Sequence, residues 1–193
     1  MKILVFADRR ESALRQVTLE SLAAARLLAG DGKIVIAVLG TDAKKDVETL
    51  AHHGADEVLL LENSELNTYT TDAYFQVWEH VIQKVNPDAI ITGHTAVGKD
   101  VAPRLAAHFS FGLLSDCTDI EVSGDEIIFT RPIYAGKAFV KKVFSSGTSF
   151  VTIRPNNFSS LEPDVARKAT IEELNVPIQK NLLRTIVTKV MKK

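Results

Sequence analysis

Short apolar runs alternate with longer segments of helical periodicity through the first hundred residues, and this alternation limits the fold more than any other feature. The runs, which are rich in Val, Ile and Leu, lie at residues 2–7, 33–39, 57–61 and 89–92. Such runs separated by helices are typical of βαβ units around a parallel sheet. The sequence therefore predicts an α/β protein with a doubly wound, mainly parallel sheet of the nucleotide-binding type.

Four helices are predicted between or after these strands. The first follows from small and apolar residues spaced three and four apart, namely Leu14, Val17, Ser21, Ala25 and Leu28, with Gly30 and Gly32 as its stop. The second and third are predicted at 43–53 and 71–85. The fourth is expected to begin near Lys99, because Pro103 is tolerated only in or near a first turn.

Beyond Gly112 the helical periodicity gives way to strand-like segments separated by turn residues. These segments lie at 118–122, 126–133, 138–144 and 149–154. The sequences Ser123-Gly124-Asp125 and Ser145-Ser146-Gly147 are typical of hairpin connections. An antiparallel hairpin region is therefore expected to be added to the parallel sheet.

The length suits one domain over residues 1–193. Its core is expected at 1–155, followed by a polar, irregular tail from residue 156 and a final strand at 182–190 that leads into Met191-Lys192-Lys193.

Bulk composition excludes several classes of protein. The 23 basic and 24 acidic residues give a net charge of −1, which offers no electrostatic surface for nucleic acid. No apolar run reaches the roughly 18 to 20 residues that span a bilayer, so no membrane insertion is expected. Cys117 is the only cysteine and is expected to be a buried apolar group in a reducing compartment. Because the chain opens directly on a strand, we expect a bacterial cytoplasmic protein, or a mitochondrial matrix protein if a transit peptide was removed.

The sharpest local motif is the G-x4-G-K frame from Gly93 to Lys99, placed between a predicted strand and a predicted helix. Two interpretations stay open. In one, a helix N-terminus holds an anion through Gly93, His94, Thr95, Gly98 and Lys99. In the other, the glycines only permit a tight turn. Asp100 stands where an ATPase needs Ser or Thr for magnesium, so no ATPase activity is expected.

Any nucleotide site would be expected at the carboxyl ends of the strands, at residues 7–10, 40–42 and 93–99. No catalytic residues and no metal site are predicted. Adjacent His52 and His53 would point about 100° apart on a helix, which is poor geometry for shared metal ligation. The sequence also holds no G-x-S-x-G, H-E-x-x-H or C-x-x-C motif.

The segment 131–138 is unusual for a hairpin because it contains both proline and glycine. It is either an ordinary kinked edge strand or a docking edge for a partner subunit. The candidate interface residues are Arg131, Tyr134, Gly136, Lys137 and Ala138.

Several motifs in order resemble those of one known family: the opening strand MKILVF, the segment GHTAVGKDVAPRLAA at 93–107, Leu114-Ser115-Asp116, TRPIYAGKA at 130–138, and the residues from Gly147 to Asn156. Over most of its length the chain resembles the N-terminal, non-flavin domain of the alpha subunit of electron transfer flavoprotein. Paralogues linked to nitrogen fixation and to carnitine share these motifs.

The resemblance implies a heterodimer with a beta subunit. Such a carrier takes electrons from dehydrogenases, including the acyl-CoA dehydrogenases of fatty-acid oxidation, and passes them through FAD to a quinone-linked or other acceptor. Most FAD contacts in the family lie in a C-terminal domain that this chain is expected to lack. The chain alone is therefore expected to bind no cofactor, to be redox silent and to serve as a scaffold. The competing hypothesis is an adenine-nucleotide-binding module of the universal-stress type, which would need the loop from Gly93 to Lys99 to bind phosphate.

Overall fold

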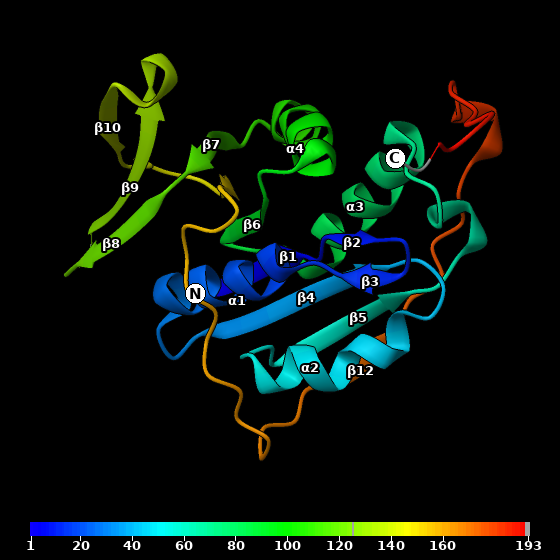
Figure 1. Ribbon diagram of the computed structural model, residues 1–193, viewed down its shortest axis with the longest axis horizontal. Coiled ribbons are helices and arrows are strands. Elements are labelled where there is room, and N and C mark those ends of the chain that lie inside the picture. Colours follow the sequence, from blue (N-terminus) through cyan, green and yellow to red (C-terminus); the bar gives the residue numbers. More distant parts are fainter. Residues whose placement is uncertain (125, 192–193) are drawn as a thin grey trace.

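A seven-stranded parallel sheet forms the centre of the computed structural model, which describes residues 1–124 and 126–191 (Figure 1). Its strands, in spatial order, are β12 (Thr170–Glu173), β5 (Glu57–Leu61), β4 (Lys33–Leu39), β1 (Lys2–Phe6), β6 (Ala89–Gly93), β11 (Ser149–Ile153) and β7 (Gly112–Cys117). Every pairing within this sheet is parallel. The four strands predicted from the first hundred residues are confirmed.

Helices cover both faces of this sheet, as the doubly wound prediction requires. On one face lie α1 (Gln16–Ala29), the short 3₁₀ turn η1 (Ala43–Asp46) and α2 (Val47–His52); on the other lie α3 (Thr71–Val85) and α4 (Ala96–Phe109). Alternate residues of β1 enter the two cores: Ile3 and Val5 face α1, whereas Leu4 and Phe6 face α3 and α4. The result is three layers with two apolar cores.

The fourth helix begins earlier than predicted. It starts at Ala96, and the Thr95 hydroxyl caps it by accepting a hydrogen bond from the Gly98 amide at 3.4 Å. Pro103 therefore lies inside the helix, where it cannot bond the Lys99 carbonyl. Both residues are exposed, so we infer that water satisfies the carbonyl that the proline leaves free.

A separate antiparallel sheet, in the order β10-β9-β8, lies beside β7 and α1 in the upper left of Figure 1. It consists of β8 (Asp119–Ser123), β9 (Glu126–Ile133) and β10 (Ala138–Lys142). Ile120 and Phe129 pair across it and bury its inner face against the α1 side of the main sheet. The predicted hairpin between β8 and β9 is confirmed by the pairing of Ser123 with Glu126, although Asp125 lies outside the described residues.

The second predicted hairpin, at 145–147, is wrong. β11 does not follow β10 in an antiparallel pair but enters the main sheet between β6 and β7. All of its residues are buried, and strands buried on both faces belong inside parallel sheets. Residues 145–147 therefore connect the two sheets.

Three further elements escaped prediction. β7 is interrupted by polar residues and by a register shift opposite β11, where Asp116 adopts a φ of 66°. β12, inside the tail expected to be irregular, is an edge strand without apolar alternation. A small hairpin, β2 (Arg9–Arg10) and β3 (Ala13–Leu14), follows β1.

The predicted final strand at 182–190 is also wrong. Its segment contains only the end of a 3₁₀ turn, η4 (Lys180–Leu182), followed by irregular chain. β12 already occupies the edge beside β5, and side chains of α3 hold the tail: the Gln179 amide donates to Gln76 at 2.8 Å and the Arg184 amide to Asp72 at 2.8 Å. No helix in the described ranges is long and apolar enough to cross a bilayer.

Candidate functional site

The structure separates the three places where a nucleotide was sought. The segment 7–10 and the segment 40–42 meet at the carboxyl ends of β1 and β4, which are neighbours in the sheet. The loop from Gly93 to Lys99 lies at the end of β6, on the other side of β1.

Close packing explains both glycines of the loop after β6. A Cβ atom on Gly98 would lie 2.0 Å from the Gly93 carbonyl oxygen, and a Cβ on Gly93 would lie 2.8 Å from the Val17 side chain of α1. A side chain at Gly98 would require the backbone to move, and one at Gly93 would require the Val17 side chain to shift. The glycines therefore bring strand, helix α4 and helix α1 together, which favours the tight-turn interpretation of the motif.

Asp100 adds a negative charge one turn into α4. Its carboxylate accepts hydrogen bonds from the Tyr69 hydroxyl at 2.6 Å and from the Thr71 hydroxyl. The bonds from Thr71 and Tyr69 hold the pKa of Asp100 below its usual range, and burial raises the pKa of Tyr69. Because this carboxylate stays charged, it opposes phosphate binding near the loop.

A polar cluster joins the carboxyl ends of β6, β7 and β11; we call its members, His94, Asp116, Thr152 and Arg154, the His94 cluster. His94 Nδ1 lies 2.9 Å from the Thr152 hydroxyl, and Nε2 lies 3.7 Å from Asp116 Oδ1. Arg154 donates to both oxygens of Asp116, at 2.9 and 2.6 Å. This pairing holds the pKa of Asp116 low, whereas burial lowers the pKa of His94.

The His94 cluster contains the residue types of a hydroxyl–imidazole–carboxylate relay, but its hydroxyl is not accessible to a substrate. Thr152 is buried, and its hydroxyl accepts a hydrogen bond from the Asp116 amide at 3.1 Å. Arg154 already engages both carboxylate oxygens. A nucleophile must reach its substrate, so this cluster is better explained as a link between three strands. Sequence reasoning found His94 but did not connect it with the other three residues.

The Arg9 side chain lies at the carboxyl ends of β1 and β4, where it contacts the Leu39 and Thr41 carbonyls. This side chain is only 7% exposed and pairs with Asp46 through Nε at 2.8 Å. Gly40 lies directly beneath it, since a Cβ there would approach the guanidinium to 3.3 Å. Arg9 thus occupies one of the places where any nucleotide site was expected.

The candidate interface residues of the β9–β10 hairpin differ in exposure. Tyr134 is 77% exposed, Gly136 and Lys137 are exposed, and Ala138 is half-buried. Arg131 instead turns toward the main sheet, where its Nη1 donates to the Ser115 hydroxyl at 3.2 Å. Phe139, which was not singled out from the sequence, is 64% exposed.

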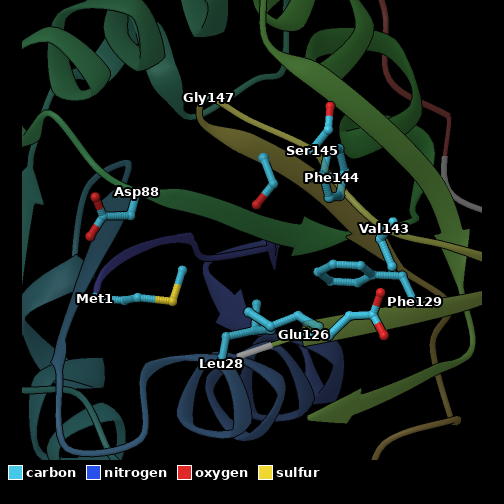
Figure 2. Close-up of a pocket in the computed structure, with 11 residues that line it drawn as sticks. Met1, Leu28, Asp88, Glu126, Phe129, Val143, Phe144, Ser145 and Gly147 are labelled. Atoms are coloured by element: carbon cyan, nitrogen blue, oxygen red, sulfur yellow. The ribbon is translucent and has the colours of Figure 1, made fainter. Parts of the chain in front are cut away.

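A cavity of about 470 Å³ lies at the opposite, amino ends of the strands, between α1 and the three-stranded sheet (Figure 2). Figure 2 shows the rings of Phe129 and Phe144 on one side of it, with the carboxylates of Asp88 and Glu126 apart from each other across its opening. This cavity lies away from the carboxyl ends of the strands, where any nucleotide site was expected. Its acidic groups do not suit a phosphate-bearing ligand.

Within residues 1–124 and 126–191, no three His, Cys, Asp or Glu side chains are grouped to hold a metal ion. Cys117 is buried, its thiol lies 3.2 Å from the Asp119 carbonyl, and burial raises its pKa to about 11. The expectation of a buried cysteine is confirmed.

Comparison with known proteins places this arrangement in a family. The model of the electron transfer flavoprotein domain matches residues 3–179. The chain belongs to the electron transfer flavoprotein domain family. This confirms the resemblance found from the motifs.

Several bacterial members of the family are similar to the chain. An electron transfer flavoprotein subunit alpha of Bacillus subtilis (strain 168) is 44% identical over 192 residues, covering 100% of this chain and 58% of that protein. The protein FixB of Clostridium saccharobutylicum is 35% identical, covering 98% and 58%. The lactate dehydrogenase (NAD(+),ferredoxin) subunit LctC of Acetobacterium woodii is 31% identical, covering 99% and 47%. The chain thus spans at most 58% of each of these three relatives.

A flavin would need a place for its pyrophosphate, and the described residues fit one poorly. The Arg9 side chain occupies the carboxyl ends of β1 and β4, and Asp100 places a negative charge beside the loop after β6. The cavity at the amino ends presents Asp88 and Glu126. We derive no flavin chemistry from the residues of this chain.

Proposed function

We propose that this chain is the scaffold and beta-subunit docking part of a heterodimeric, FAD-containing electron carrier. The proposal is supported by the family match and by the 44% identity to an electron transfer flavoprotein subunit alpha. The whole carrier would move electrons from dehydrogenases, such as acyl-CoA dehydrogenases, to a quinone-linked or other acceptor. FAD would be held mainly by the portion of the relatives that this chain does not span, and the chain itself would perform no catalytic step.

The single observation that carries the docking proposal is the exposed β9–β10 hairpin. β10 is an edge strand, and the hairpin exposes two aromatic side chains, Tyr134 and Phe139. Tyr134 and Ala135 both have positive φ, at 50° and 55°, so an aromatic side chain is held outward by a left-handed turn. Exposed aromatic residues on an unpaired edge are typical of protein interfaces.

The experiment is a pulldown of the chain by the beta subunit. Tyr134→Asp and Ala138→Asp should each weaken capture at least tenfold, because each buries a carboxylate in the contact. Val165→Asp is the matched control: Val165 is an exposed apolar residue that precedes β12 at the far edge of the main sheet. Unchanged capture of both hairpin variants would reject this docking surface, and failure of the unmodified chain to bind would reject the proposed function.

The adenine-nucleotide-binding alternative is less well supported. It would require a phosphate in the loop from Gly93 to Lys99, beside the charged Asp100. The proposed location is the bacterial cytoplasm, since the similar proteins are bacterial and the single cysteine suits a reducing compartment.

A further inference from the structure

The Arg9 side chain makes a set of contacts that resembles a bound ligand. Its guanidinium donates four hydrogen bonds, all to backbone carbonyl oxygens: Nη1 to Leu39 (3.2 Å) and Thr41 (3.1 Å), and Nη2 to Ser12 (3.1 Å) and Asp42 (3.3 Å). The ion pair between Nε and Asp46 Oδ2, at 2.8 Å, completes the set. One planar cation thus joins the loop after β1 with the loop after β4 and the turn η1.

The five groups that contact the Arg9 guanidinium can all accept hydrogen bonds. Four are carbonyl oxygens and the fifth is a carboxylate whose side chain is 11% exposed. A planar fork of N–H donors matches such a set, whereas a phosphate has only acceptor oxygens and negative charge. This set of acceptor groups therefore favours a cation over a nucleotide phosphate.

We propose that the acceptor groups at the carboxyl ends of β1 and β4 form a guanidinium-binding cradle whose native occupant is Arg9. Arg9 is then the residue that closes this end of the sheet. Truncating it creates a site for a small planar cation and still does not create a nucleotide site. The cradle is made of groups of this chain and involves neither a partner subunit nor flavin.

The test is thermal unfolding of Arg9→Ala with about 50 mM guanidinium chloride, against sodium chloride at equal ionic strength. Guanidinium should raise the Tm of Arg9→Ala by about 2 °C, because a ligand that binds only the folded state stabilises it. The unmodified chain, whose cradle is full, should show no rise. In the double variant Arg9→Ala/Asp46→Ala, guanidinium should raise the Tm by less, because the carboxylate that pairs with the cation is absent.

AMP and ATP are added to the same samples, and neither should raise the Tm of Arg9→Ala. Equal effects of guanidinium and sodium chloride on Arg9→Ala, or stabilisation by a nucleotide, would overturn the proposal. If Arg9→Ala is unfolded at 25 °C, the same salts are compared for recovery of its far-ultraviolet circular dichroism. Recovery with guanidinium alone then supports the cradle, and no difference between the salts rejects it.

Discussion

Gly98 packs so closely on Gly93 that a Cβ atom at Gly98 would lie 2.0 Å from the Gly93 carbonyl oxygen. The contact joins the first turn of α4 to the end of β6, and the Thr95 hydroxyl, which accepts from the Gly98 amide, fixes the same turn. The G-x4-G-K motif, which resembles a phosphate loop, is thus explained by the close packing of α4 on the end of β6.

Gly98→Ala is therefore expected to destabilise the chain by about 3 kcal/mol, because backbone atoms must move to admit the methyl group. The measurement is the free energy of unfolding in urea. Lys99→Ala, which changes the exposed neighbouring side chain, should shift it by less than about 0.5 kcal/mol. Equal stability of Gly98→Ala and the unmodified chain would refute the packing explanation.

Removing His94 should alter how stability depends on pH. Burial lowers its pKa, although Asp116 opposes this shift while Lys99, Arg154 and Arg131 reinforce it. A folded-state pKa below the unfolded value means that the unfolded chain takes up the proton more readily. The contribution of neutral His94 is therefore fully present above the ordinary histidine pKa of about 6.5 and is lost as the pH falls from there through the lower folded-state pKa.

The check is the Tm of His94→Gln and of the unmodified chain between pH 7.5 and 5.5. The Tm of the unmodified chain should exceed that of His94→Gln by less as the pH falls. His80→Gln is the matched control, because it removes one histidine from an exposed position. A widening difference on acidification would show that protonated His94 is stabilised by Asp116, contrary to this account.

Asp116 is expected to need both its charge and its backbone geometry. It pairs with Arg154 through both oxygens and has a φ of 66°, which Asn tolerates better than Ala. Because Arg154 is partly exposed, Asp116→Asn should cost only about 1 kcal/mol, and Asp116→Ala about 1 kcal/mol more. Urea unfolding measures both. Equal losses for the two variants would show that the left-handed backbone has no energetic effect.

The strands of the first hundred residues could be predicted because each is a continuous apolar run between helices of clear periodicity. β7 and β12 could not be predicted in this way. Asp116 interrupts the pattern of β7, and β12 is a short polar edge strand. Residues 149–154 were predicted as a strand, and β11 (Ser149–Ile153) forms there, but the prediction placed it in the wrong sheet. Turn residues that are typical of a hairpin also serve to connect two sheets.

The site was predicted in part. The sequence placed residues 7–10 and 40–42 at the carboxyl ends of their strands, but nothing in its spacing shows that the side chain of Arg9 folds back onto Thr41. The His94 cluster likewise draws on three strands that are distant in sequence. Contacts of this kind depend on sheet order, which local patterns do not contain.

Cys117 should react slowly with thiol reagents in the folded chain. It is buried, and a pKa of about 11 leaves almost no thiolate at pH 8. Labelling with an aromatic disulfide reagent at pH 8 should be at least 100-fold slower in buffer than in urea. Rapid labelling without urea would show that the β7 end opens readily.

The most direct measurement of the central claim is the visible absorption of the purified chain after mixing with FAD and desalting. The chain alone, and the chain with the beta subunit, should retain no flavin bands. The full-length Bacillus subtilis alpha subunit with its beta subunit should retain them. Flavin bands retained by the chain alone would contradict the scaffold account and would place a flavin site among its own residues.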